Sequence, residues 1–442
     1  MNTEAAKNED FAMEDRELVN TEELNEIEED EDIEAFEDND DREDNEETND
    51  EQDAQHAKLK YLHIFGPDTK NSYGIMSQLY LHLDLTRHRF LIMGSRKNMA
   101  RFPKLKEFRG LQFIPDVNPI KKIIHFYKKL TEADVIVWHS LFFPRQQYAY
   151  FLALFRHFLK KSIWIEWGAD LYLWKYSNQN FKGMLRNFVH RRIREKMRVV
   201  GCCFAVDDQE VHAQFGDDVK CFYTPLANPK KDPTGLIDEV EAGKPNMEGK
   251  EKPFYNVQIA HNSFSFNNHV RLIELMKKFD REDMRFILPL NYGIYGINGQ
   301  FGGVSYRNTV IKYAENAFKN AKVSVIKKAI DFNRYLGVLW NMDIVVFDFD
   351  RPCGLGTLRI LLLMGKKIYL PAGSPYYNFL VSKGLPIFDT NKIPEMTFEE
   401  FVEPPVYTTK EWVYSYMNND HVIQYWLDMF EEIEKNKEAY FQ

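Results

Sequence analysis

The sequence predicts an α/β protein made of two units, each with a parallel sheet covered by helices. Two observations predict this class. Short apolar runs that end in glycine or a polar residue alternate with amphipathic stretches at helical spacing. One polar segment rich in glycine and proline, 231–253, divides the alternation into two series. A chain of 442 residues is long enough for two such units.

The first series occupies residues 57–230. Expected helices lie at 71–83 and 120–130. The strands that we expect, from their short apolar runs, lie at 59–66, 88–94, 133–140 and 201–208, and a further strand that runs into a loop lies at 161–172. These elements predict one doubly wound sheet.

The second series occupies residues 254–395, and an extension at 396–442 ends in a helix, 420–442, that closes the fold. Helices are expected at 267–279, 306–318 and 332–342. Strands are expected at 254–263, 284–293, 322–330, 343–349 and 366–371. Ligands of such sheets bind at the carboxyl ends of the strands, so we expect a site in the crevice between the two units.

Charge is divided unevenly along the chain. Residues 1–55 contain 26 acidic and 3 basic residues, which leaves a net charge of +13 on the remainder. The acidic segment has few aromatic residues and cannot bury enough apolar surface to offset chain entropy, so we expect residues 1–56 to be disordered. A solvating tail and a cover over the basic body are both open roles for it.

Composition also excludes several classes of protein. No nucleic-acid-binding signature and no signal peptide is found. The longest apolar patch, 148–159, is short and interrupted by Arg156, so no membrane-spanning helix is expected. The four cysteines have neither disulfide nor zinc spacing, which favours a reducing cytoplasm: Cys202, Cys203, Cys221 and Cys353.

A glycine-rich loop is the first candidate site. Gly354, Gly356 and Thr357 stand where a strand enters an apolar helix. Glycine permits close backbone approach, and amide groups at a helix start attract an anion, so this loop suits a phosphate. An ordinary strand-to-helix turn is the alternative.

The polar stretch 259–269 is the second candidate. Asn262 and Ser263 follow a strand, while Asn267 and His269 lie at a helix start. These side chains suit a crevice wall that contacts phosphate or sugar. An asparagine here, Asn267 or Asn268, is equally suited to an N-cap role.

Two strand ends in the first unit supply candidate bases. Asp170 or Glu166, in "WIEWGADLY", and His139, after "VIVW", could accept a proton from a hydroxyl group. The neighbouring aromatic residues suit sugar stacking: Trp164, Trp167 and Tyr172. A purely structural role is open for each residue.

Two further features of the sequence each have two interpretations. The "DFD" at 348–350 resembles an acidic pair that holds a divalent metal, but charged residues at strand ends are common, and we expect no metal. The stretch 181–200 interleaves basic and apolar residues at helical spacing. That pattern suits an interfacial helix on anionic lipid, or a core helix with a solvated basic face.

The order of several motifs resembles a known family. "WGADLY", "RVVGCCFA", "HNS…NNH", "LPLNY", "IDFNRYLGVL" and "GLGTL…MGKKIYL" occur as in the TDP-4-acetamido-4,6-dideoxygalactose (Fuc4NAc) transferases of enterobacterial common antigen synthesis, also described as 4-alpha-L-fucosyltransferases. The resemblance covers roughly residues 60–385. It implies a GT-B fold, with two Rossmann-like domains facing across a cleft, and no cofactor.

The resemblance also implies roles for individual residues. Asp170 and His139 would be catalytic, and Gly168 and Pro289 also match. The donor-binding residues would be Asn262, Ser263, Asn267, His269, Tyr292, Tyr335, Gly354, Gly356 and Thr357. This chain departs from the pattern in its acidic segment, in an insertion at 295–303, and at Ile360, where related transferases use a carboxylate to read the ribose.

These observations together predict a metal-independent glycosyltransferase. It would move Fuc4NAc or fucose from a nucleotide diphosphate, dTDP by the resemblance, to an undecaprenyl-diphosphate-linked saccharide. It would be cytoplasmic, peripheral on the anionic inner face of the inner membrane, with no nucleic-acid partner. The alternatives are transfer of another sugar in capsule or exopolysaccharide assembly, and a non-catalytic sugar-nucleotide- or polysaccharide-binding protein.

The charge division predicts that the acidic segment competes with lipid for the basic body. Each basic residue near an anionic surface contributes on the order of 1 kcal/mol, screened by salt, and a tethered segment competes at high effective concentration. Deleting residues 1–55 should therefore tighten binding to anionic vesicles at low salt. Equal co-sedimentation of the full-length and truncated proteins would rule this out.

Overall fold

The computed structural model describes residues 59–66, 69–94, 108, 110–115, 117–143, 145–172, 181–225, 238, 240–244, 253–293, 302–328, 330–349, 353–406 and 419–441. The acidic segment 1–56, Asp350 and most of the insertion at 295–303 lie outside these ranges.

The first half contains a seven-stranded parallel sheet, with strand order β3-β2-β1-β4-β5-β6-β7. Its strands are β1 (Tyr61–Phe65), β2 (His88–Ile92), β3 (Gln112–Phe113), β4 (Val135–His139), β5 (Ser162–Glu166), β6 (Val199–Cys202) and β7 (Lys220–Tyr223). Its helices are α2 (Thr69–His82), α3 (Pro119–Thr131), α4 (Gln146–Leu154), α5 (His157–Lys160), α6 (Ala169–Tyr172), α7 (Phe181–Arg194) and α8 (Asp207–Phe215).

Helices cover both faces of this sheet, because its central strands are apolar on both faces. Alternate residues of one strand enter different cores: Ile136 and Trp138 of β4 pack with α3, α4, α5 and α7. Val135 and Val137 face the other core, which contains α2. Every residue of β1, β4 and β5 is buried.

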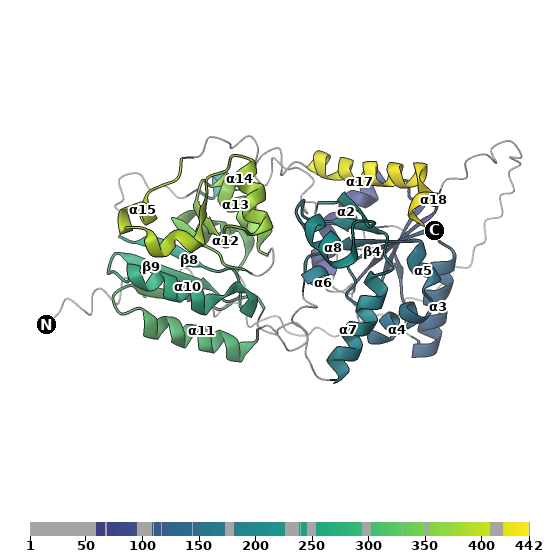
Figure 1. Cartoon of the computed structure of the whole chain (residues 1–442), viewed down its shortest axis with the longest axis horizontal. Coiled ribbons are helices and arrows are strands. Elements are labelled where there is room, and N and C mark those ends of the chain that lie inside the picture. Colours follow the sequence, from purple (N-terminus) through teal and green to yellow (C-terminus); the bar gives the residue numbers. More distant parts are fainter. Residues whose placement is uncertain are drawn as a thin grey trace, which may run out of the picture. The chain divides into compact units, whose positions relative to one another are not determined.

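A helix from the C-terminal end of the chain completes the second of these cores. The helix expected at 420–442 is observed as α17 (Asn419–Lys435) and α18 (Lys437–Tyr440). Trp426 and Phe430 of α17 pack among residues of β1, β2 and β4, and the Trp426 indole donates to the carbonyl of Pro225 at 3.1 Å. Figure 1 shows α17 lying along the first half, with α3, α4 and α7 on the other side of its sheet.

The second half contains a six-stranded parallel sheet, with strand order β10-β9-β8-β11-β12-β13. Its strands are β8 (Tyr255–Ile259), β9 (Met284–Pro289), β10 (Lys322–Ile326), β11 (Ile344–Val346), β12 (Lys367–Leu370) and β13 (Ile387–Asp389). Its main helices are α10 (His269–Met276), α11 (Val304–Ala317), α12 (Phe332–Asn341), α13 (Leu355–Leu363), α14 (Pro375–Ser382) and α15 (Phe398–Val402). Strands are added toward one edge of the sheet from β8 to β10 and toward the other edge from β11 to β13. Ligands of such sheets bind where this order reverses, here between β8 and β11.

The structure corrects the sequence-based boundaries in two places. The stretch 181–200 is not one helix, because α7 ends at Arg194 and Val199 begins β6. The strand expected at 201–208 therefore begins and ends earlier, and Asp207 starts α8. Strands β3, β7 and β13 were not anticipated.

Part of the predicted linker packs with the second half. Val240 is buried in the core that contains Leu336 and Leu339. The indole of Trp340 also donates to the Val240 carbonyl at 2.5 Å.

We predict that α17 is required for the stability of the first half. Trp426→Ala removes a fully buried indole and should lower the free energy of unfolding by about 3–5 kcal/mol. Gln424→Ala, at an exposed position of the same helix, should change it by less than about 0.5 kcal/mol. Urea unfolding of both variants measures this, and equal midpoints would contradict the assignment.

Candidate functional site

The glycine loop lies between the carboxyl end of β11 and the first turn of α13. Gly354 is the N-cap residue of α13, with φ of 66°. A Cβ atom at Gly354 would lie 2.7 Å from the ring of His261, so a side chain here would meet both strain and a collision. Gly354 therefore lets the loop pack against the loop that follows β8.

Gly356 has a different environment. It lies in the first turn of α13 and is exposed, and a Cβ atom added to it would have nothing within 4 Å. The N-cap residue contributes no side-chain hydrogen bond to this helix. Amide groups of a first helical turn have no partner within the helix and attract an anion. The open space beside Gly356 is therefore suited to a phosphate.

Thr357 connects this turn to α12. Its Oγ1 lies 2.6 Å from the hydroxyl oxygen of Tyr335. Burial raises the pKa of Tyr335 to about 12, so its hydroxyl group keeps its proton at neutral pH. The two predicted residues thus lie in contact beside the glycine loop.

The loop after β8 is held by its own side chains. Asn262 Oδ1 accepts from the backbone of Phe264 at 3.0 Å and from Asn267 Nδ2 at 2.8 Å. The Ser263 hydroxyl group donates to the carbonyl of Leu290 at 2.7 Å. All three predicted polar residues are buried, so the contacts that they make shape the loop.

The same loop contacts the glycine loop through polar groups. The Cys353 thiol lies 3.7 Å from Asn267 Oδ1, and Gly354 packs against His261. The sequence reasoning missed His261 as a site residue. Its position at a strand end, directly before Asn262, was the available signal.

His269 and Tyr292 border this loop in different ways. His269 is buried with Nδ1 3.0 Å from the Tyr306 hydroxyl oxygen, and burial lowers its pKa to about 4. Tyr292 is 61% exposed, and its ring meets that of Phe264 edge-on at 5.8 Å. Among the predicted donor residues, Tyr292 thus presents an aromatic surface to solvent.

Asp170 lies in α6, at the carboxyl end of β5. Its carboxylate accepts three hydrogen bonds, from the amides of Leu141 at 2.9 Å and Trp167 at 2.8 Å and from the indole of Trp164 at 2.7 Å. Burial raises the pKa of Asp170. A carboxylate has about four acceptor positions, so acting as a base would require a hydroxyl group to reach the fourth.

Glu166 lies beside it and accepts from the amides of Gly168 at 2.5 Å and Cys203 at 2.8 Å. Burial and the neighbouring Asp207 and Asp170 raise the pKa of Glu166 well above its usual value. Glu166 therefore braces two loops at this edge of the sheet.

The structure also limits the expected aromatic platform. Trp164 and Tyr172 are buried in the core of the first half. Trp167 is half-buried, so it is the remaining candidate for sugar stacking.

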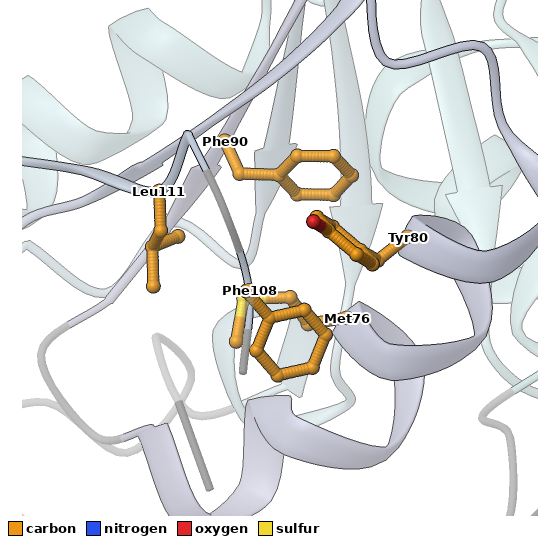
Figure 2. Close-up of a pocket in the computed structure, with 5 residues that line it drawn as sticks. All are labelled: Met76, Tyr80, Phe90, Phe108 and Leu111. Carbon is orange, nitrogen blue, oxygen red and sulfur yellow. The ribbon is translucent and has the colours of Figure 1, made fainter. Parts of the chain in front are cut away.

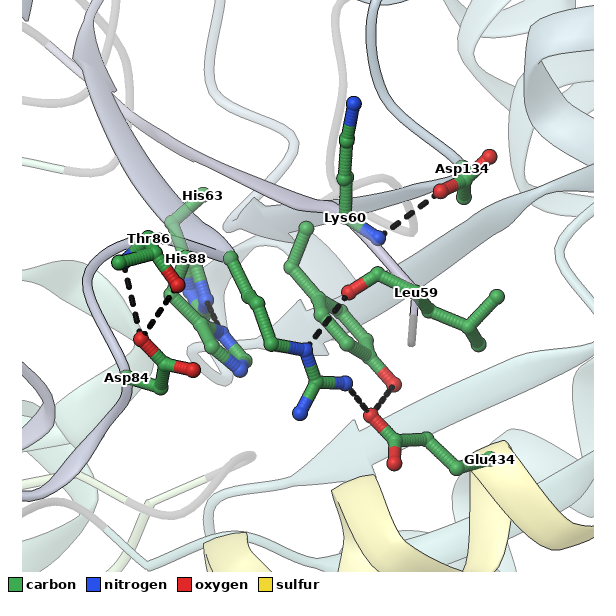
Figure 3. Close-up of polar contacts among 10 residues, drawn as sticks. Leu59, Lys60, His63, Asp84, Thr86, His88, Asp134 and Glu434 are labelled. Carbon is green, nitrogen blue, oxygen red and sulfur yellow. Dashed lines mark hydrogen bonds and ion pairs between the residues drawn. The ribbon is translucent and has the colours of Figure 1, made fainter. Parts of the chain in front are cut away.

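His139 ends β4 and belongs to a chain of three buried histidines. Its Nε2 lies 3.0 Å from His63 Nδ1, and His63 Nε2 lies 3.0 Å from His88 Nδ1. Figure 3 shows the His63–His88 end of this chain beside Asp84 and Thr86. Burial lowers the pKa of His139 to about 3, and its Nδ1 has no hydrogen-bond partner among the described residues. His139 is thus neutral and enclosed.

Asp348 is the one acid of the "DFD" stretch that the structure describes. Asp348 forms an ion pair with Arg271, which also donates to Asn391 Oδ1 at 2.7 Å. No group of three or more histidine, cysteine or acidic residues in the described ranges is arranged to hold a metal ion.

A small pocket elsewhere is apolar. Met76, Tyr80, Phe90, Phe108 and Leu111 line it, as Figure 2 shows. The rings of Tyr80 and Phe108 meet edge-on at 4.8 Å. This pocket is a packing gap beside β2 without the polar groups that a nucleotide needs.

Comparison with known proteins gives two findings. A family model described as 4-alpha-L-fucosyltransferase, glycosyl transferase group 56, matches residues 76–422. The fold is similar to that of HepE from Anabaena solved with UDP and glucose, with TM-score 0.56 and 10% identity over 85% of this chain and 100% of that one. Sucrose-phosphate synthase from Thermosynechococcus elongatus gives TM-score 0.56 and 12% identity over 85% and 99%. These structures confirm the predicted pair of parallel-sheet α/β domains of GT-B type.

Buried histidines predict a loss of stability in acid. Burial lowers the pKa values of five histidines to about 3 or 4: His88, His139, His190, His261 and His269. The unfolded chain binds these protons near pH 6.5, whereas the folded chain does not. The free energy of unfolding should therefore fall as the pH is lowered from about 6.5 to 4, by about 1.4 kcal/mol per pH unit for each histidine.

Urea unfolding between pH 7 and pH 5 measures this slope. His190→Gln should reduce this slope by about 1.4 kcal/mol per pH unit, which corresponds to one proton. A wild-type stability that does not depend on pH in this range would contradict the prediction.

Proposed function

Because this chain belongs to the 4-alpha-L-fucosyltransferase family, glycosyl transferase group 56, we propose that it transfers a 6-deoxyhexose from a nucleoside diphosphate to a lipid-linked saccharide. The donor would be dTDP-Fuc4NAc or a fucose nucleotide, and the acceptor an undecaprenyl-diphosphate-linked saccharide. It is a glycosyltransferase with two GT-B-type domains. Transfer of a different sugar in capsule or exopolysaccharide assembly is the second candidate.

The open first turn of α13 carries this proposal. Gly356 leaves space beside amide groups that no capping side chain occupies. During transfer, negative charge develops on the diphosphate as the bond from the sugar to its oxygen breaks. Fixed amide dipoles aimed at that position stabilise the charge without reorganisation. HepE, whose fold is similar to that of this chain, has been solved with UDP and with UDP-glucose.

The surrounding donor residues take two kinds of role in the proposal. Asn262, Ser263 and Asn267 hold the loop after β8 in shape through the hydrogen bonds described above. His269 fixes the loop's exit through Tyr306. The exposed ring of Tyr292 would stack on the base or sugar, and Tyr335 would orient Thr357.

The acceptor hydroxyl group needs a base in the first half, and Asp170 is our candidate. Its carboxylate accepts three N–H donors, and the hydroxyl group would take the fourth acceptor position. His139 is the alternative, because its Nδ1 has no hydrogen-bond partner among the described residues. Because His139 is buried, the acceptor would have to displace part of the protein that covers it.

The contrast between the two loop glycines tests the proposal. Gly356→Val should lower the affinity for the nucleoside diphosphate about tenfold, roughly 1.4 kcal/mol, because its side chain fills the open space. Its melting temperature should stay close to wild type. Gly354→Ala should instead destabilise the fold, because φ is 66° and the added Cβ meets His261, a strain of about 1–2 kcal/mol.

Calorimetric titration with dTDP, UDP and GDP, together with thermal unfolding, separates the two effects. It also identifies the preferred nucleotide. Wild-type affinity in a folded Gly356→Val protein would overturn the phosphate assignment. A separate assay with an isotopically labelled sugar nucleotide measures sugar transfer itself.

A further inference from the structure

The helices on one face of the first half have an unusual composition. Together, α3, α4, α5 and α7 contain no aspartate or glutamate. α3 contains four lysines, and α7 contains five basic residues, of which Arg194 is buried. On the opposite face of the same sheet, α17 carries Asp428, Glu431, Glu432 and Glu434.

These helices form one continuous layer. The Phe126 ring of α3 meets Tyr148 of α4 edge-on at 5.0 Å, and Tyr127 meets Phe158 of α5 at 5.4 Å. α4 packs against α7, and Gln146 lies 3.2 Å from His190. Figure 1 shows α3, α4, α5 and α7 grouped on this side of the half.

Each of the three longer helices has a second apolar stripe that faces solvent. A surface helix ordinarily has one apolar stripe, which faces the core. Here the outward stripes follow helical spacing at positions i, i+4 on α3 and α4 and i, i+3, i+7 on α7. Their large exposed members are Ile120, Ile124, Tyr150, Leu154, Phe181, Met184 and Phe188, and Leu154 and Phe181 are 76% and 80% exposed.

Basic groups lie among these apolar side chains. The guanidinium group of Arg192 lies over the exposed ring of Phe188, 5.5 Å from its centroid. Lys121 and Lys128 of α3 are exposed. An apolar surface with basic residues and no acid on its helices is complementary to the interface of an anionic bilayer, where rings and alkyl groups enter the acyl boundary and bases meet headgroups.

We propose that the outward surface of α3, α4 and α7, the docking face, binds anionic lipid headgroups and orients the first half on the membrane with α17 turned away. Two acids lie directly beyond these helices, where Glu132 pairs with Lys129 of α3 and Glu195 pairs with Arg191 of α7. Arg194 of α7 lies over Phe215 of α8, 6.0 Å from its centroid. The inference deepens the proposed function and rests on it in one respect: a lipid-linked acceptor is presented at such a surface.

None of the described helices is long and apolar enough to span a bilayer. The expected signature is binding that needs both the apolar stripes and anionic lipid, and that weakens with salt.

Vesicle co-sedimentation of the full-length protein tests the proposal. Wild type should bind vesicles that contain phosphatidylglycerol and fail to bind pure phosphatidylcholine. Leu154→Glu with Phe188→Glu should weaken binding about tenfold or more, as should Lys121→Glu with Arg192→Glu. The control pair, Val381→Glu with Val406→Glu, adds the same charge as the Leu154 and Phe188 pair, at exposed positions of the second half, and should bind within about twofold of wild type.

The arms of the experiment separate docking from catalysis. The affinity of the face variants for nucleoside diphosphate should equal that of wild type, and their transfer to a lipid-linked acceptor in vesicles should fall. Equal vesicle binding by wild type, face variants and control would overturn the docking face and leave the proposed function standing. Wild-type protein that binds vesicles as expected but binds no nucleotide would overturn the proposed function and leave the docking face standing. Wild-type protein that binds no vesicle but self-associates through these helices would assign the face to a second copy and overturn the proposal.

Discussion

Both sheets are parallel throughout, and this single constraint determines most of the packing. A parallel strand is apolar on both faces, so each sheet needs a helix layer above and below it. In the first half the described elements α3, α4, α5 and α7 supply one layer, while α2 and α17 supply the other. In the second half α10 and α11 cover one face and α12, α13 and α14 the other. The polar residues are left for the strand ends.

At these strand ends, buried side chains hold the loops. Asp170 and Glu166 accept hydrogen bonds from backbone amides of other loops at the same sheet edge. Asn262 accepts a hydrogen bond from a backbone amide of its own loop, after β8. A buried carboxylate is costly unless it is hydrogen-bonded. The loops of the candidate site are therefore fixed in position before any ligand binds, which is what stabilisation of a developing charge requires.

The sequence was sufficient for the fold class and for the position of the glycine loop at the start of a helix, since both depend on local patterns: apolar runs and glycines before a helix. It was not sufficient for contacts that depend on strand register. The histidine chain exists because β1 pairs with β4 so that Phe65 lies opposite His139, and with β2 so that Tyr61 lies opposite His88. The distinction between Gly354 and Gly356 likewise depends on His261, about 90 residues away. The pattern that we propose for lipid binding was recognised only on α7, because the stripes of α3 and α4 become one surface only when the helices pack.

The position of α17 has a consequence for biosynthesis. A ribosome releases the strands of the first sheet early, but the helix that covers one of its faces emerges only after the whole second half has been made. Until then Tyr61, Phe65 and Phe90 form an apolar surface without the cover of Trp426 and Phe430. The nascent first half is therefore a natural client for chaperones. A fragment cut between the halves would lack the same cover, whereas a circular permutant that places α17 ahead of β1 would supply it.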